Sequence, residues 1–247
     1  MLNEQTIEKM NGMKLSAMAE AYEQQLSSGE HAKLSFEERI GLMVDCEWTA
    51  REQRKLTRRL RAAKPRYRSA SLEDVDFKHP RGLKRQQVLS LGSCGWIQDR
   101  HNLLITGPTG IGKSYLACAF VERACRRGFT ARYVRMSRLL HEIAIGRGDG
   151  SYTRLLTRLA KLDLLAIDDW MLAPLRDAER RDLIEVIEDR AEHPAIVKKL
   201  IEYALAIQAT FIVGDDYSFS KRGMELEMIT SRYSDSTFMA GMFFSGL

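Results

Sequence analysis

A glycine-rich segment carries the residue types that bind phosphate. Gly107, Gly110 and Gly112 permit backbone conformations in which successive N–H groups face one anion. Lys113 adds a positive charge, and Ser114 adds a hydroxyl of the kind that ligates Mg²⁺ beside a nucleotide. The spacing G-x-x-x-x-G-K-S therefore predicts a P-loop that binds ATP and Mg²⁺, formed by residues Gly107, Pro108, Thr109, Gly110, Ile111, Gly112, Lys113 and Ser114.

Two acidic residues follow a second apolar segment. Residues 164–167 are continuously apolar, which is typical of a buried strand in a parallel sheet. Asp168 and Asp169 come directly after them, at the edge where open α/β sheets bind ligands. We expect Asp168 to hold Mg²⁺ together with Ser114, and Asp169 to orient or deprotonate an attacking water. The predicted catalytic residues are therefore Lys113, Asp168 and Asp169, and the predicted reaction is ATP hydrolysis.

The elements that must position these residues indicate an α/β protein. Strands are expected near residues 102–106, 130–135 and 163–168, and helices near 113–127, 137–145, 151–161 and 176–192. Strands that alternate with helices in this way predict a parallel, doubly wound sheet. An N-terminal helical region precedes it. Its long helix is expected to run from about residue 36 to residue 63, with Ser35 and Glu38 as a capping-box pair at its start and Pro65 after its end.

The end of that long helix is strongly basic. Residues 51–68 contain nine Lys or Arg side chains and one Glu, whereas residues 194–247 carry five basic and six acidic side chains. Such a helix is typical of salt-sensitive binding to the phosphate backbone of DNA, although a solvated helix face remains the alternative. The predicted DNA-binding residues are Arg51, Arg54, Lys55, Arg58, Arg59, Arg61 and Lys64.

Composition excludes several classes of protein. The chain has 247 residues and a net charge of +5, and it contains no apolar run long enough to predict a transmembrane helix. Its first residues lack the basic and apolar regions of a signal peptide. The four cysteines show no metal-ligand spacing, which favours reduced thiols. We therefore expect a cytoplasmic protein without a membrane partner.

Several of these segments resemble the IstB family, the transposition helper ATPases of insertion sequences. The resemblance rests on residues 34–39, 56–64, 107–117, 147–152, 168–170 and 172–175. The family is similar to the DnaC helicase loaders and belongs to the AAA+ class. It implies an AAA+ core behind the N-terminal helices, and ATP-dependent assembly of a homo-oligomer on double-stranded DNA. It also implies delivery of target DNA to a transposase.

The resemblance covers residues 1–193 and ends near Pro194. An AAA+ site needs a polar sensor on the next strand and an arginine from a neighbouring subunit, and residues 195–247 do not resemble the family. A strand at 209–213 with Asp215 or Asp216 at its edge, and Arg232 as arginine finger, could be substitutes. The predicted division is residues 1–66 as the helical, DNA- or partner-binding region, 67–193 as the ATPase core and 194–247 as a divergent tail.

The predicted function is thus an ATP-binding AAA+ protein that assembles on double-stranded DNA and assists a transposase, with hydrolysis resetting the assembly. The divergent tail leaves an alternative open. In this alternative, the protein is a nucleotide-gated DNA-binding or helicase-loading module with little hydrolysis. The reason is that loss of a transition-state arginine lowers the rate of ATP hydrolysis by roughly 10³-fold or more. A small-molecule kinase is disfavoured because no segment reads as a lid over a second substrate.

Overall fold

The computed structural model describes residues 2–78, 82–106, 109–170, 175–190, 210–213 and 242–243. The chain divides into two units, residues 1–58 and 59–247. The three-part division expected from the sequence stays a prediction. Residues Gly107, Pro108, Asp215, Asp216 and Arg232 lie outside the described part of the chain.

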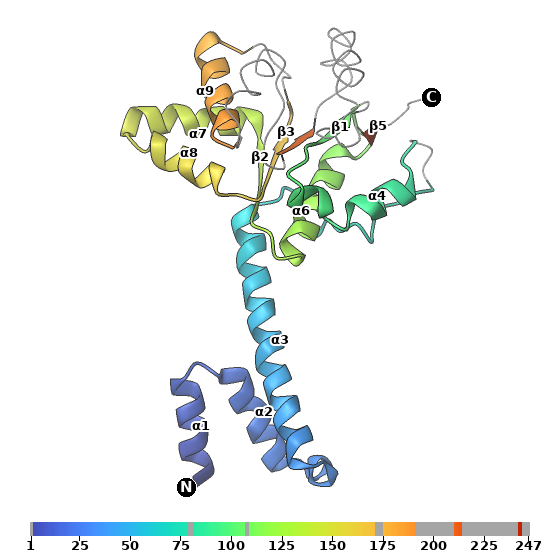
Figure 1. The fold of residues 1–247 in the computed structure, drawn as a ribbon, viewed down its shortest axis with the longest axis vertical. Coiled ribbons are helices and arrows are strands. Elements are labelled where there is room, and N and C mark those ends of the chain that lie inside the picture. The colour runs from blue at the N-terminus through green and yellow to red at the C-terminus, as the bar shows by residue number, and fades with distance from the viewer. Residues whose placement is uncertain are drawn as a thin grey trace. The chain divides into compact units, whose positions relative to one another are not determined.

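Helices make up the N-terminal unit (Figure 1). Its elements are α1 (Leu2–Gly12), α2 (Ser16–Ser27), a 3₁₀ turn (Gly29–Lys33) and the first part of α3 (Phe36–Ala63). The N-terminal helical region expected from the sequence is confirmed, and α1 ends at Gly12.

One carboxylate of α3 joins α2 to α3. Leu15 precedes α2 and offers no capping side chain, so the first N–H groups of α2 need another acceptor. Glu47 supplies it: its Oε2 accepts from the N–H groups of Ala17 (3.0 Å) and Met18 (3.2 Å). Its Oε1 meets Arg51 Nε at 2.7 Å. The ion pair with Arg51 and these backbone donors hold the pKa of Glu47 below its usual value.

The long helix α3 begins and ends as the sequence predicts. Ser35 and Glu38 form a reciprocal capping box: Ser35 N–H donates to the Glu38 carboxylate (2.8 Å), and Glu38 N–H donates to the Ser35 hydroxyl (3.2 Å). At the other end Lys64 adopts a left-handed conformation (φ 50°), and Pro65 cannot continue the helix. α3 crosses the division between the two units.

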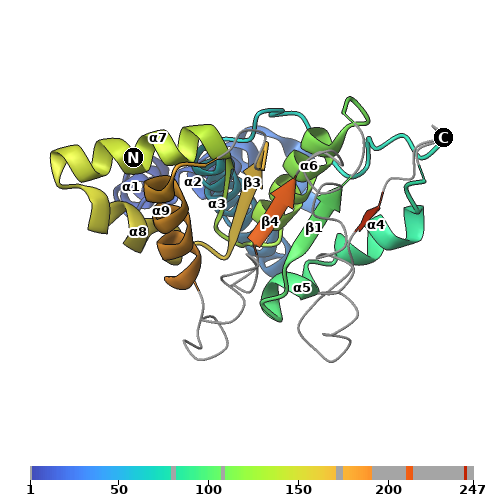
Figure 2. The ribbon, with the colours of Figure 1, turned by 90° about the horizontal axis from the view of Figure 1, so that it is seen from above.

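A parallel sheet forms the centre of the second unit (Figure 2). Among the described residues its order is β2-β3-β4-β1-β5, and every pairing is parallel. The strands are β1 (Leu103–Thr106), β2 (Ala131–Arg135), β3 (Leu164–Asp168), β4 (Thr210–Val213) and β5 (Met242–Phe243). The strand expected at 209–213 is therefore present as β4, and it separates β1 from β3.

Helices cover both faces of this sheet. They are α4 (Arg85–Leu91), α5 (Gly95–Gln98), α6 (Lys113–Arg126), α7 (Met136–Asp149), α8 (Tyr152–Ala160) and α9 (Asp177–Glu188). Leu104, Leu165 and Ile167 face one buried cluster with α7, α8 and α9. Because side chains alternate along a strand, their neighbours face the other side, where α6 packs across the sheet. The predicted parallel α/β arrangement is confirmed, whereas α5 was not predicted.

Residues 147–152 hold α9 against α7 and α8. Arg147, near the end of α7, donates to Asp182 of α9 (2.8 Å) and stacks 4.0 Å from the ring centre of Tyr152. The Tyr152 hydroxyl donates to Glu185 of α9. A Cβ added to Gly146 would lie 3.2 Å from the Tyr152 backbone, so the close turn between α7 and α8 favours glycine. This segment of the family resemblance thus has a structural role.

Within the described residues, no helix combines the length and the apolar character that crossing a membrane would require.

Candidate nucleotide-binding site

The second half of the predicted P-loop adopts the backbone that its glycines allow. Gly110 and Gly112 have φ of 88° and 96°, values that side-chain-bearing residues rarely adopt. Gly112 is the N-cap of α6, so the free N–H groups of the helix begin at this loop. The loop thereby presents backbone donors and the positive end of a helix dipole to one place.

Lys113 is the first residue of α6, and only 7 % of its surface is exposed. The ammonium and the positive end of the helix dipole both attract an anion to this place. A phosphate bound at this end would offset both charges. Ser114, the predicted Mg²⁺ ligand, is the next residue of α6 and is half-buried. Burial and position thus fit the roles expected of both residues.

Asp168 is the last residue of β3 and is almost fully buried, with 1 % of its surface exposed. The pairing of the strands shows how far along the sheet Asp168 lies relative to β1, which precedes the P-loop. Ile167 and Leu104 both stand opposite Ile212 of β4, so Asp168 is level with Ile105, one residue before the end of β1. Two strand spacings make the lateral separation roughly 10 Å. The structure therefore brings the carboxylate and the end of β1, which the P-loop follows in the sequence, to the same sheet edge.

Both carboxylate oxygens of Asp168 accept hydrogen bonds. The Tyr133 hydroxyl, on the neighbouring strand β2, donates to Oδ2, and the Asp169 N–H donates to Oδ1 (3.0 Å). Burial, and then the adjacent Asp168 carboxylate, raise the pKa of Tyr133 above its usual range, so the phenol remains a donor. The two bonds fix the orientation of Asp168 and leave lone pairs for a metal ion or its waters.

Tyr133 was not identified from the sequence. The sequence signal was weak: a buried tyrosine usually finds a partner for its hydroxyl, but the partner depends on which strand lies beside β2. The register that places Tyr133 opposite Ala166, two residues before Asp168, comes from the tertiary structure.

Asp169 lies in a sharp turn directly after the strand. Its φ is 57°, in the left-handed region that Asp and Asn tolerate better than most residues. The side chain is half-buried, and the next residue, Trp170, returns to the core. The turn separates the two carboxylates: Asp168 stays within the strand edge, and Asp169 leaves it.

The donor set fits a magnesium ion that is shared with a nucleotide. Mg²⁺ is commonly held by one or two protein oxygens together with phosphate and water. Asp168 supplies a buried, oriented carboxylate, and Ser114 supplies a hydroxyl at the P-loop. Among the described residues there is no group of three or more His, Cys, Asp or Glu side chains suited to a metal ion. A metal ion held there would complete its coordination with nucleotide phosphates and water, as Mg²⁺ commonly does.

The predicted DNA-binding residues fall into two groups. Arg51 and Arg54 both contact Glu47, at 2.7 and 3.2 Å, and Lys55 contacts Glu52 at 2.7 Å. In the described part of the chain, the remaining members of the set form no ion pair; they are Arg58, Arg59, Arg61 and Lys64. The first group is therefore partly neutralised within the protein, whereas the second keeps its charge available.

Comparison with known proteins decides the family. The family model described as IstB-like ATP binding protein matches residues 8–205. The chain belongs to this family. The match extends beyond residue 193, where the sequence resemblance was expected to end, and it leaves residues 206–247 outside.

Named relatives agree with this membership. The chain is 46 % identical over 191 residues to the ATP-binding protein of insertion sequence IS1162 from Pseudomonas fluorescens, covering 77 % of this chain and 83 % of that protein. It is 45 % identical over 190 residues to an insertion sequence ATP-binding protein of Sinorhizobium fredii, covering 77 % of each. The crystal structure of the DnaC helicase loader matches with a TM-score of 0.47 and 17 % identity, over 69 % of this chain and 97 % of that one.

Family membership, the P-loop at the end of β1 and the parallel sheet together confirm the predicted fold class. The protein is an α/β P-loop protein of the AAA+ class with an N-terminal helical region. It is an IstB-like ATP-binding protein of insertion sequences.

Proposed function

We propose that this IstB-like protein is an ATPase that assembles as a homo-oligomer on double-stranded DNA and assists the transposase of its insertion sequence. The observation that carries the ATPase proposal is Asp168, buried and oriented by two hydrogen bonds at the level of the P-loop. Family membership supports ATP binding and the insertion-sequence context. The unpaired basic residues at the end of α3 support DNA as the partner.

In this proposal each site residue has one role. The Lys113 ammonium and the N–H groups of the loop bind the β- and γ-phosphates, while Ser114 and Asp168 hold Mg²⁺. When bound, the metal neutralises charge that develops on the phosphates. Tyr133 positions the Asp168 carboxylate. Asp169 orients the attacking water and accepts its proton.

We propose that the protein binds DNA mainly through its positive charge, by contacts with the phosphate backbone. ATP bound between subunits would join them into an oligomer whose basic helices contact the phosphate backbone, and hydrolysis would release that assembly. An arginine from the neighbouring subunit would complete the site. Arg232 is our candidate for that arginine; it lies outside both the described residues and the family match.

A second function is favoured by the extent of the family match. Because the match ends at residue 205, the tail that should supply the sensor and the arginine is unlike the family model. Without those groups the protein would be a nucleotide-gated DNA-binding or helicase-loading module with little hydrolysis. β4 does fill the sheet between β1 and β3, which favours the first proposal.

Steady-state ATP hydrolysis by the full chain separates the two, measured with and without long double-stranded DNA. The key variant is Asp169→Asn, which keeps the shape of the side chain and tolerates the left-handed backbone. We expect DNA-stimulated turnover that falls by about 10²–10⁴-fold in the variant, with nucleotide binding retained. Nucleotide binding with no turnover in the unaltered protein would instead establish the second function.

A further inference from the structure

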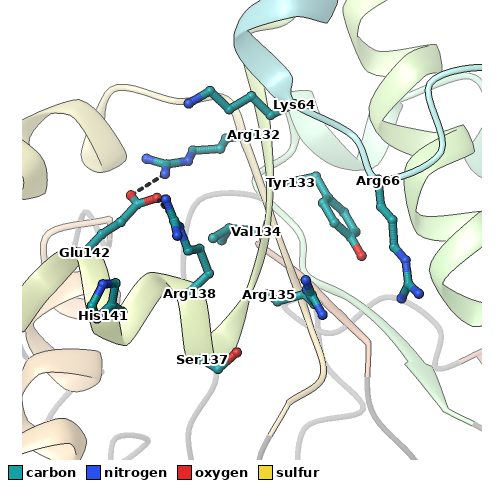
Figure 3. A pocket seen from close by; sticks show the side chains of 10 residues that line it. All are labelled: Lys64, Arg66, Arg132, Tyr133, Val134, Arg135, Ser137, Arg138, His141 and Glu142. Carbon is teal, nitrogen blue, oxygen red and sulfur yellow. Dashed lines mark hydrogen bonds and ion pairs between the residues drawn. The ribbon is translucent and has the colours of Figure 1, made fainter.

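A basic hollow lies beside β2, at one end of the described sheet (Figure 3). Its volume is about 600 Å³, and its lining comes from three nearby segments of the second unit. They are the residues directly after α3, the strand β2 and the first two turns of α7. The cationic lining residues are Lys64, Arg66, Arg132, Arg135 and Arg138, and the one carboxylate in the lining is Glu142.

That carboxylate neutralises only part of the hollow. Glu142 pairs with Arg132 and lies 3.6 Å from Arg138. Lys64, Arg66 and Arg135 form no ion pair within the described residues, and all three side chains are exposed. Figure 3 shows Arg66 and Arg135 on the same side of β2, next to the Tyr133 ring. The hollow therefore keeps an excess of positive charge that an anion would offset.

We propose that this hollow binds phosphates of the DNA backbone and forms a second DNA-contacting surface in addition to α3. The proposal rests on the proposed function, because it assumes that the protein assembles on DNA. One observation favours DNA over an acidic protein segment. Lys64 in the lining directly follows the unpaired arginines at the end of α3, Arg59 and Arg61, so the hollow continues the basic surface that is proposed to contact DNA.

The chemistry of the unpaired groups fits phosphate. The planar guanidinium groups of Arg66 and Arg135 each offer paired N–H donors that match two phosphate oxygens. Duplex DNA carries one phosphate per roughly 1.7 Å of its axis, so a hollow of this size can meet more than one of them. Contacts of this kind carry no base specificity, and they add to affinity and to its salt dependence.

The test compares two double variants that remove equal charge from the same unit. The first double variant, Arg66→Gln with Arg135→Gln, removes two unpaired positive charges from the lining of the hollow. The matched control is Arg154→Gln with Arg158→Gln, two exposed arginines of α8 that do not line the hollow. Affinity for a long labelled duplex is measured at saturating ATP and Mg²⁺ over a range of salt concentrations. Thermal melting verifies that each variant folds.

We expect the hollow variant to bind DNA about tenfold more weakly near 0.1 M salt, with the slope of log affinity against log salt reduced by about 2. The control should keep the affinity and slope of the unaltered protein. Arg66→Lys with Arg135→Lys should keep most of the slope, because counterion release depends on charge; equal losses in the Lys and Gln variants would overturn the proposal.

Failure of this proposal differs from failure of the proposed function. If the unaltered protein binds DNA but the hollow variant matches the control, the hollow is not a DNA site, and the assembly on DNA stands. An acidic protein ligand of the hollow would give that same result. If the unaltered protein binds no DNA at any salt concentration, both proposals are wrong.

Discussion

Asp168 and Arg58 each carry a charge that we assign to ligand binding, but the protein surrounds them differently. Asp168 is buried, and two hydrogen bonds fix its carboxylate. Arg58 is exposed on α3 and forms no ion pair with the described residues. A buried, oriented charge interacts strongly and depends on each neighbour. Exposed charges interact weakly and are screened by salt, so several of them together determine the binding affinity. The two surfaces should therefore respond differently to substitution.

The nucleotide site should lose most from a single substitution. Lys113→Ala removes charge-assisted hydrogen bonds to phosphate, each worth about 1.5–3 kcal/mol, so we expect ATP affinity to fall by about 100-fold or more. Titration with a fluorescent ATP analogue measures the loss. Lys161→Ala, an exposed lysine after α8, is the matched control and should bind ATP normally. Equal affinity in both variants would show that the P-loop does not bind the nucleotide.

Tyr133→Phe examines the orientation of Asp168. The change leaves one buried carboxylate oxygen without its donor, and losses of this kind typically weaken metal binding by about 10–100-fold. We expect the Mg²⁺ concentration for half-maximal hydrolysis to rise about tenfold, with ATP affinity nearly unchanged. Tyr67→Phe, on an exposed tyrosine, is the control. An unchanged Mg²⁺ requirement would make Tyr133 a structural residue only.

The same hydrogen bond makes a prediction about pH. The pKa of Tyr133 is raised, so its neutral, donating form persists beyond the pH at which an ordinary tyrosine ionises, about 10. The Mg²⁺ requirement of the unaltered protein should then stay level from about pH 7 to pH 10. A Mg²⁺ requirement that rises as the solution approaches pH 10 would mean that the phenol ionises normally.

The two halves of the basic run should differ even though they carry similar charge. Arg58→Gln with Arg61→Gln removes unpaired charges, so we expect the salt slope of DNA binding to fall by about 2 and the affinity by about tenfold. Arg51→Gln with Arg54→Gln removes side chains that already contact Glu47, so the loss should be about two- to threefold. Equal losses in the two variants would show that pairing with Glu47 does not restrict Arg51 and Arg54.

The smallest effect should come from Glu47→Gln, which weakens the connection between α2 and α3. The folded pKa of Glu47 lies below its ordinary value of 4.5, so its contribution to stability is present above pH 4.5 and disappears as pH falls through the folded value. Helix melting by circular dichroism should show the variant as less stable at pH 7, and the difference should vanish in acid. A difference that persists in acid would assign the effect to packing rather than to the charge.

The sequence alone determined the local features of this protein. The P-loop spacing, the capping box before α3, Pro65 after it and the apolar run before Asp168 all depend on neighbours within a few residues. Such patterns specify backbone conformation and burial directly, so the elements and the nucleotide-binding segments could be predicted from them. The excess of Lys and Arg over residues 51–68 identified the basic run, but it could not show which of these side chains form ion pairs within the protein.

Only the tertiary structure decided which distant residues share a partner. Tyr133 reaches Asp168 because β2 pairs with β3, and Glu47 accepts hydrogen bonds from the first N–H groups of α2 because α2 packs beside α3. The hollow exists because Lys64 and Arg66, directly after α3, lie near β2 and α7 within the second unit. Contacts of this kind depend on strand order and packing across the whole unit, and composition and spacing along the chain do not encode them in any local pattern.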